Sequence, residues 1–265
     1  MGLTSLLERL QPVPASRILL AVDFDGTLAP IVSDPDQAAP NPQTAAILSE
    51  LNQCLLRVAI ISGRDTDFLV SRVPLPRALF IGNHGLEERH DGASRLVAEA
   101  QPYLERLARA ADAVAAFSQA RVPGITIERK RAAVSVHFRQ TADPSASGAA
   151  LEPTMREIAR QEQLQLQAGR LVWELRPPIE IDKGAVLRRL AADMQPAAIV
   201  YVGDDRTDAN AFSTLKRMTA VRTVAVGVRS PEVPEDVFVD CDLTVDGVAG
   251  VTQLLTQLLD VCANA

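Results

Sequence analysis

Two aspartates, Asp23 and Asp25, directly follow the apolar run 18–22 and are separated by a single aromatic residue. Side chains at positions i and i+2 of an extended chain point to the same side, so both carboxylates can face one locus. One carboxylate can attack phosphorus, and the other can protonate the leaving oxygen and later take a proton from water. An Asp-Gly turn with no chemistry is the alternative, and on this stretch alone the two interpretations stand level.

Three other apolar runs end in residues that could join this pair. The residues are Ser62, Gly63 and Arg64 after run 56–61, Asn83 and His84 after run 78–81, and Asp204, Asp205 and Asp208 after run 198–202. Ligands of open α/β sheets bind at the carboxyl ends of the strands, so we expect these side chains to gather at one edge. Such clustered acids require a cation, and the candidate is Lys183, one of only three lysines among 27 basic residues.

The donor set indicates the metal and the contacts to phosphate. Hard carboxylate oxygens, without a cluster of cysteine and histidine, favour Mg²⁺ over zinc. The hydroxyl of Ser62, the ammonium group of Lys183 and the backbone amides around Phe24 and Gly63 are candidates for holding phosphoryl oxygens. The same residues therefore predict Mg²⁺-assisted chemistry on a phosphate ester.

The elements that would position these residues alternate along the chain. Five apolar runs are typical of strands buried on both faces, namely 18–22, 56–61, 78–81, 198–202 and 223–226. Helices are predicted after Asn41 and over 182–194 and 208–218. Strands alternating with helices predict right-handed crossovers and an α/β fold, with a Rossmann-like doubly wound parallel sheet as its core.

The middle of the chain breaks this alternation. Residues 125–130 and 133–139 alternate apolar and polar side chains, as half-exposed antiparallel strands do. A helix over 152–163 and strands over 164–167 and 171–175 are predicted to follow. We interpret residues 108–178 as a smaller α+β cap domain inserted into a core domain made of residues 1–107 and 179–265.

The motifs resemble the signature of the haloacid dehalogenase superfamily of phosphotransferases. That signature is D-x-D-G-T, then Ser or Thr, then Lys, then GDxxxD, and it matches here in order and in predicted context. The resemblance implies that Asp23 is the nucleophile, Asp25 the acid and base, and Lys183 the catalytic cation. It also implies Mg²⁺ held by Asp23, the backbone carbonyl of Asp25 and Asp204, with Asp208 close by. Whether Asp205 or Asp208 is the second acidic group at the metal stays open.

Over about residues 18–230 the chain is further similar to trehalose-6-phosphate phosphatases. The shared patterns are DxDGTL, SGR, GxHG and GDDxTD, together with Glu-Arg-Lys at 128–130, His-Phe-Arg at 137–139 and Glu-Leu-Arg-Pro at 174–177. Ala209 stands where the family commonly has Glu, and Phe24 replaces its usual Tyr. The resemblance implies Mg²⁺-dependent hydrolysis of trehalose 6-phosphate. Alternatives are a phosphatase of sucrose phosphate or glucosylglycerol phosphate, a phosphosugar mutase and a receiver-like signalling domain.

The inserted domain is expected to read the sugar, because acceptors and donors together suit a field of hydroxyls. Within it, Glu128 and Lys130 share one face of their strand. The predicted substrate-binding residues are Arg64, Asn83, His84, Glu128, Lys130, Arg139 and Glu174. A solvated charged strand is the alternative for 128–131, a core histidine for His84 and a helix-start salt bridge for Arg64.

Composition narrows the classes of partner. The net charge of −6 over 265 residues argues against a nucleic-acid footprint, which would be basic. No apolar run approaches the roughly 20 residues that span a bilayer, and the first residues lack the features of a signal peptide. Three widely spaced cysteines are typical of a reducing compartment. We expect a cytoplasmic protein, taken as a monomer, that binds a small phosphosugar and neither nucleic acid nor membrane.

Overall fold

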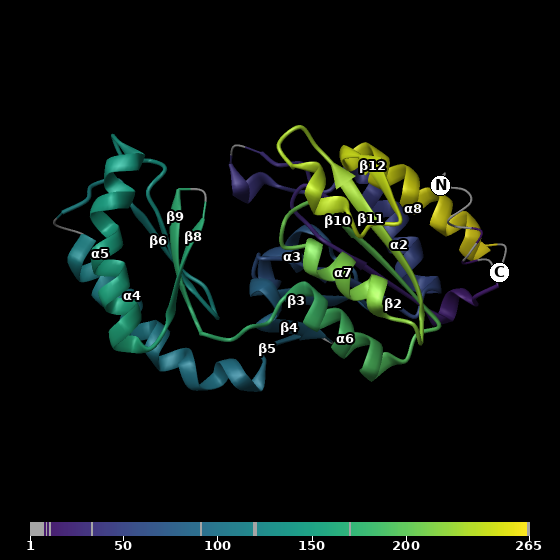
Figure 1. Cartoon of the computed structure of the whole chain (residues 1–265), viewed down its shortest axis with the longest axis horizontal. Helices are drawn as coiled ribbons and strands as arrows, with labels where there is room; N and C mark the ends of the chain where they lie inside the picture. Colours follow the sequence, from purple (N-terminus) through teal and green to yellow (C-terminus); the bar gives the residue numbers. More distant parts are fainter. Residues whose placement is uncertain are drawn as a thin grey trace. The chain divides into compact units, whose positions relative to one another are not determined.

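The computed structural model (Figure 1) describes residues 8, 10, 12–32, 34–90, 92–118, 121–169 and 171–263. The chain forms two compact units, one of Met1–Ser94 with Ile181–Ala265 and one of Arg95–Glu180. The first boundary lies earlier than the predicted one at 107/108, which falls inside helix α4 (Leu104–Ser118). Leu107 is buried in the core of the second unit, so α4 belongs wholly to that unit. The second boundary lies two residues from the predicted 178/179.

The first unit contains an eight-stranded sheet in the order β12-β11-β10-β1-β2-β3-β4-β5. Its strands are β1 (Ile18–Val22), β2 (Arg57–Ile61), β3 (Leu79–Gly82), β4 (Glu87–His90), β5 (Ala93–Leu96), β10 (Ala198–Gly203), β11 (Arg222–Arg229) and β12 (Leu243–Asp246). The pairings from β12 to β3 are parallel, and β4 runs antiparallel to β3. All five predicted runs are strands of this sheet, which confirms the α/β fold with a doubly wound parallel core.

Helices cover both faces of the sheet (Figure 1). They are α2 (Pro42–Cys54), α3 (Thr66–Arg72), α6 (Lys183–Met194), α7 (Ala209–Arg217) and α8 (Gly247–Ala263). Alternate β1 residues take part in two separate cores: Leu20 packs with α2, α3 and α8, whereas Leu19 packs with α6 and α7. This double burial explains why β1 is a continuous apolar run. None of the described helices is both long and apolar enough to cross a bilayer.

Short 3₁₀ turns occupy several connections. They are η1 (Ala15–Arg17), η2 (Pro35–Gln37), η3 (Asn83–Gly85), η4 (Ala98–Tyr103) and η5 (Glu235–Phe238). Of these, η3 lies directly between β3 and β4, where the sequence places two candidate site residues.

The second unit contains an antiparallel sheet in the order β6-β7-β9-β8, with two helices packed on it. Its elements after η4 are α4, β6 (Thr126–Arg129), β7 (Val134–His137), α5 (Pro144–Glu162), β8 (Gln165–Gly169) and β9 (Val172–Arg176). Helix α5 begins eight residues before the predicted start, because Asp143 caps it by accepting a hydrogen bond from the Ala146 amide. Val134 and Leu175 face the helices in the buried core.

Candidate active site

The centre of the site is a buried ion pair between Asp23 and Lys183. Asp23 follows β1, and its amide bonds the Val202 carbonyl of β10 at 2.9 Å, which extends the parallel register past Val22. Lys183 is the first residue of α6, and its Nζ lies 3.0 Å from Asp23 Oδ1. Both side chains are almost fully buried. The chain reverses direction across the sheet between β1 and β10, so the pair sits at the switch point where α/β sheets bind ligands.

Asp208 organises the surroundings of this pair. Its Oδ1 accepts hydrogen bonds from Lys183 Nζ and the Tyr201 hydroxyl, each at 2.5 Å. Its Oδ2 accepts from the amides of Asp204 and Asp205, each at 2.9 Å. A carboxylate offers about four acceptor positions, so these four donors occupy Asp208 completely. Asp208 therefore positions Lys183 and the backbone of residues 204–205. The carboxylate oxygens that remain available to a ligand belong to its neighbours Asp23 and Asp204.

Asp204 lies opposite Asp23 and is held from the β1 loop. Thr27 Oγ1 donates to Asp204 Oδ1 at 3.1 Å. Gly26 has φ of +78°, and a Cβ there would lie 2.1 Å from Asp204 Oδ2. Glycine is thus required at position 26 both for its backbone conformation and for the close approach of Asp204.

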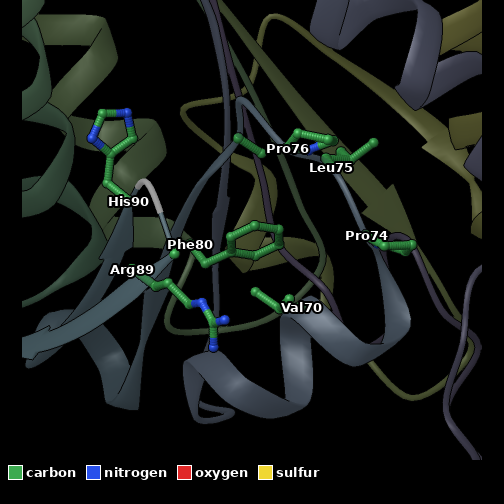
Figure 2. A pocket seen from close by; sticks show the side chains of 9 residues that line it. Val70, Pro74, Leu75, Pro76, Phe80, Arg89 and His90 are labelled. Carbon is green, nitrogen blue, oxygen red and sulfur yellow. The ribbon is translucent and has the colours of Figure 1, made fainter.

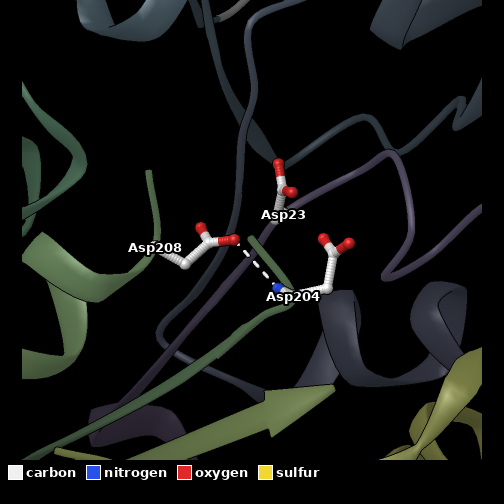
Figure 3. Close-up of side chains that lie close together, drawn as sticks. All are labelled: Asp23, Asp204 and Asp208. Carbon is white, nitrogen blue, oxygen red and sulfur yellow. Dashed lines mark hydrogen bonds between the residues drawn. The ribbon is translucent and has the colours of Figure 1, made fainter. Parts of the chain in front are cut away.

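Three carboxylates converge in this site: Asp23, Asp204 and Asp208 (Figure 3). Each offers an oxygen within 4.8 Å of the others, and all three residues are buried. With Lys183 as the buried cation between them, the group retains negative charge that a divalent cation would offset. Carboxylate oxygens are the donors that Mg²⁺ prefers, and because Asp208 is saturated, Asp23 and Asp204 fit best as its side-chain ligands. The Asp25 side chain is not part of this group.

Burial and charge crowding shift the pKa values here. Burial raises the pKa of Asp23 well above its usual value against the opposing effect of Lys183, and nearby Asp208 adds to the rise. Burial and the neighbouring Asp208 and Asp205 likewise raise the pKa of Asp204 to about 7. Burial acts to lower the pKa of Lys183, but the adjacent carboxylates outweigh it and raise that pKa. Lys183 therefore stays protonated, and its single positive charge is shared between the carboxylates of Asp23 and Asp208.

Asp25, the predicted acid and base, is held by Arg64. Arg64 Nε and Nη2 donate to its two carboxylate oxygens, each at 2.8 Å. The Asp25 side chain keeps 36% of its exposure, in contrast to the buried Asp23. The sequence grouped Arg64 with the substrate contacts, whereas its guanidinium group here contacts a catalytic candidate.

The loop after β2 presents the predicted phosphate contacts. Ser62 is buried, and its Oγ accepts a hydrogen bond from the Arg64 amide at 3.2 Å. A Cβ on Gly63 would lie 2.7 Å from the His84 ring, so the imidazole rests against the Gly63 backbone. The position of His84 next to the Ser62–Gly63 loop agrees with a site role.

Asn83 and His84 both adopt left-handed backbone conformations, with φ of 50° and 57°. Asn83 Nδ2 donates to Glu87 Oε2 at 2.7 Å, and the Thr66 hydroxyl donates to Glu87 Oε1 at 2.9 Å. Glu87 is fully buried on β4. Its carboxylate therefore anchors the strained turn that carries His84, and Asn83 acts as a link in that anchor.

Three residues of the site were missed from the sequence, namely Thr27, Glu87 and Tyr201. Thr27 belongs to the DxDGT pattern, so its position near the site was predictable from the sequence, but its hydrogen bond to Asp204 was not. Tyr201 lies inside an apolar strand and is typical of the core. Glu87 lies four residues after Asn83, and only its charge in an otherwise buried turn could have indicated a role.

Three of the seven predicted substrate-binding residues, Glu128, Lys130 and Glu174, gather on the polar face of the second unit's sheet. The register places Glu128 opposite Ser135 and Ser135 opposite Glu174, so the three share one face. Lys130 Nζ lies 3.6 Å from Glu174 Oε2 and 4.0 Å from Glu128 Oε2. The group also includes His137, whose Nε2 is 3.0 Å from Glu128 Oε2. We call Glu128, Lys130, Ser135, His137 and Glu174 the polar cap face.

Arg139 is not brought into the polar cap face. It lies beyond the end of β7 and is exposed. Among the residues that the structure describes, no hydrogen bond or ion pair connects it to Glu128 or Glu174. The predicted role of Arg139 in substrate binding therefore stays a prediction.

A separate apolar cavity of about 280 Å³ lies beside the end of α3 (Figure 2). Its walls come from Val70, Pro74, Leu75, Pro76, Ala78, Phe80, Arg89, His90 and Gly92. None of the predicted site residues lines it, and its apolar character does not suit a phosphosugar. The acidic group at the end of β1 remains the candidate active site.

Comparison with known sequences agrees with this geometry. A family model described as trehalose-phosphatase matches residues 21–241, which include every residue of the acidic group. The chain is 37% identical over 203 residues to a trehalose-phosphate phosphatase of Mycobacterium marinum, covering 73% of this chain and 50% of the relative. It is 30% identical over 275 residues to probable trehalose-phosphate phosphatase 9 of Oryza sativa subsp. japonica, covering 94% and 71%. The chain spans about half the length of the trehalose-phosphate phosphatases of Mycobacterium marinum, M. avium and M. ulcerans.

A solved structure shares both the fold and part of the sequence. The C-terminal domain of the C. albicans trehalose-6-phosphate phosphatase aligns over 98% of this chain and 97% of that one, with a TM-score of 0.74 and 25% identity. The matched range contains both the acidic group and the polar cap face. On the family model, the sequence relatives and the shared fold, the chain belongs to the trehalose-phosphatase family.

Proposed function

We propose that the chain is a Mg²⁺-dependent phosphatase that hydrolyses trehalose 6-phosphate to trehalose and phosphate through an aspartyl-phosphate. The observation that carries the reaction is the buried Asp23–Lys183 pair, with Asp204 at the same strand edge. The substrate is supported by membership of the family and by the polar cap face. The compartment that we expect is the cytoplasm.

The first step is attack of the Asp23 carboxylate on phosphorus. The phosphorus–oxygen bond to the sugar breaks, and the leaving oxygen takes a proton from Asp25, which gives the free sugar and an aspartyl-phosphate on Asp23. An anionic nucleophile and a phosphate dianion repel each other, and Lys183, 3.0 Å from Asp23, offsets part of that charge. Bound Mg²⁺ would supply the remaining charge compensation at the phosphoryl oxygens.

The second step regenerates Asp23. Asp25, now a carboxylate, takes a proton from water, and the water oxygen attacks phosphorus so that phosphate leaves Asp23. The Ser62 hydroxyl accepts from the Arg64 amide and keeps its own proton free to donate to a phosphoryl oxygen. The amides near Phe24 and Gly63 are the further donors that we assign to the phosphoryl group.

The polar cap face supplies the chemistry that a disaccharide requires. Glu128 and Glu174 are acceptors and Lys130 is a donor, held within 4.0 Å of both carboxylates. Because these groups are partly buried, a sugar whose hydroxyls do not meet them leaves them without a hydrogen-bond partner, which costs binding free energy. The face therefore favours one pattern of sugar hydroxyls over another. We propose that this face selects trehalose over other leaving groups.

The test is phosphate release from trehalose 6-phosphate, sucrose phosphate and glucosylglycerol phosphate, with Mg²⁺ and with a chelator. We expect trehalose 6-phosphate to have the highest kcat/KM and activity to vanish when the metal is removed. Asp23→Asn should abolish turnover, and Asp240→Asn, which removes the negative charge that pairs with Lys216 at the surface, is the matched control. Comparable rates on sucrose phosphate would overturn the substrate, and activity in Asp23→Asn would overturn the nucleophile.

The role of the polar cap face is tested separately with Glu174→Gln. This variant should lower kcat/KM for trehalose 6-phosphate, because it removes the charge that Lys130 and Ser135 contact. Turnover of p-nitrophenyl phosphate, which has no sugar, should be unchanged. Equal losses on both substrates would place Glu174 in the general architecture and not in selection.

A further inference from the structure

The guanidinium group of Arg64 forms a bidentate pair with the carboxylate of Asp25, which we call the fork. Nε and Nη2 bind one carboxylate oxygen each at 2.8 Å, which is the bidentate geometry that fixes both the plane and the direction of a carboxylate. Each oxygen has a second lone pair that the fork does not use. Asp25 can therefore exchange a proton on its open side while Arg64 still holds it.

Arg64 is itself held at its side chain. Its guanidinium carbon lies 4.6 Å from the centre of the Phe68 ring, close enough for a cation–π contact. Phe68 packs edge-on against Phe24 with ring centres 5.8 Å apart. Phe24 is the residue between the two aspartates and is fully buried. The side chain of Arg64 is thus supported, through Phe68 and Phe24, by the same loop that carries Asp25.

The backbone of Arg64 is also fixed. Its amide donates to Ser62 Oγ at 3.2 Å, and its carbonyl accepts from the Asn83 amide at 2.8 Å. A Cβ on Gly82 would lie 2.6 Å from that carbonyl oxygen, so the two loops are in close contact here. A residue constrained at its amide, carbonyl and side chain cannot adjust freely to a mobile sugar.

We propose that Arg64 is a positioning residue that aims the carboxyl group of Asp25 at the leaving oxygen, and is not a contact for the substrate. This inference rests on the proposed function only for the role of Asp25 as acid and base. It replaces the sequence-based assignment of Arg64 to substrate binding. Proton delivery in a transition state depends on the direction of the donor, so a freely rotating Asp25 delivers the proton less effectively.

The decisive experiment uses a series of substituted phenyl phosphates, from p-nitrophenyl phosphate to phenyl phosphate, with Arg64→Ala and Arg64→Lys. A good leaving group departs without a proton, and a poor one requires the acid. We expect Arg64→Ala to change kcat/KM for p-nitrophenyl phosphate by about 3-fold or less and to lower it for the poorest leaving groups by roughly 10²-fold, the usual loss from misplaced catalytic groups. Arg64→Lys should restore part of the loss.

The second step gives a spectroscopic readout. Breakdown of the aspartyl-phosphate needs Asp25 for every substrate, so it should become slow in Arg64→Ala. Release of p-nitrophenol should then show a pre-steady-state burst larger than that of the unmodified enzyme. A substitution that only loosens the fold would lower the burst amplitude and the steady-state rate together.

Arg89→Ala is the matched control. Arg89 also pairs with an aspartate, Asp67, at 2.5 Å, and its side chain has 26% exposure against 24% for Arg64. It should leave the dependence on leaving group unchanged. Thermal unfolding of both variants shows whether either substitution disturbs folding.

Any one of three outcomes would overturn the inference. A uniform loss over the whole phenyl phosphate series would assign Arg64 to the phosphoryl group. A loss on trehalose 6-phosphate, measured in parallel, with no loss anywhere in the phenyl phosphate series would assign Arg64 to the sugar. In an Asp25→Asn background, Arg64→Ala should have no additional effect on phenyl phosphate, the poor leaving group, and multiplying losses would contradict action through Asp25. Because this series contains no sugar, failure of the trehalose assignment leaves the test of Arg64 intact.

Discussion

Tyr201→Phe tests how far the buried network of Asp208 stabilises the protein. The hydroxyl of Tyr201 donates to Asp208 Oδ1 at 2.5 Å from within β10, and its side chain is completely buried. The substitution removes one oxygen and leaves the ring, so packing against Phe212, whose ring centre is 5.8 Å away, is retained. The perturbation is therefore a single hydrogen bond to a charged acceptor.

The expected magnitude follows from that bond. Hydrogen bonds to charged groups contribute about 1.5–3 kcal/mol to the free energy of unfolding. Asp208 keeps Lys183 and two backbone amides, so no carboxylate oxygen is left without a donor. For a chain of this size 1 kcal/mol shifts the unfolding midpoint by roughly 2–4 °C, which predicts a fall of about 3–12 °C.

The assay is thermal and urea unfolding followed by circular dichroism. Tyr103→Phe is the matched control, because Tyr103 is the other tyrosine of the chain and lies in the second unit. Phosphatase activity at low temperature should persist in Tyr201→Phe, since Lys183 keeps its bond to Asp208. A change in unfolding free energy no larger than that of Tyr103→Phe would refute the claim that this hydrogen bond stabilises the fold.

Two further predictions concern crowding and thiol chemistry. Alanine at Gly26 or Gly92 must adopt positive φ, at a cost of about 1–2 kcal/mol in each case, but only at position 26 would its Cβ meet Asp204. Gly26→Ala should therefore lose activity and Gly92→Ala keep it; equal activity would contradict the reasoning. Burial and the neighbouring Asp242 raise the pKa of Cys241 to about 12, so its reaction with a disulfide reagent at pH 8 should be roughly 10³-fold slower than that of an unfolded thiol. Comparison with a Cys241→Ala variant identifies the kinetic phase of the reaction that belongs to Cys241. If that phase were as fast as the reaction of an unfolded thiol, the reasoning would be contradicted.

The sequence was sufficient for features set by continuous patterns. Strand β1 was predicted residue for residue because burial on both faces demands an unbroken apolar run. The meeting of Asp23 with Asp204 followed, because both come directly after strands whose carboxyl ends share an edge. Lys183 was distinguished by the rarity of lysine in this chain.

Features that depend on tertiary partners were not predictable in the same way. Strands β4 and β5 have mostly polar residues and carry no clear alternation, so they were missed. The first half of α5 is rich in small residues, which hides the helical period. The fork of Arg64 on Asp25 joins residues 39 positions apart, and nothing in either motif specifies that partner.

The saturation of Asp208 is a similar case. The spacing of the acidic motif indicated that Asp208 lies close to the metal, but a spacing cannot show which oxygens are already occupied. Only the placement of Tyr201 and of the 204–205 amides shows that Asp208 has no acceptor left. Its role as an organiser of the site therefore emerges from the structure.

The position of β1 in the sheet has a consequence for the order in which the protein folds. Its neighbour β2 follows closely in the chain, but its other neighbour, β10, is synthesised only after the whole of residues 95–180. Closing so long a loop is entropically costly and slow, and a second unit that folds first shortens the effective loop. Asp23 therefore meets Lys183 and Asp204 only after the second unit and β10 have been synthesised. A chain that stalls or is cut before β10 contains both DxD aspartates and no assembled acidic site.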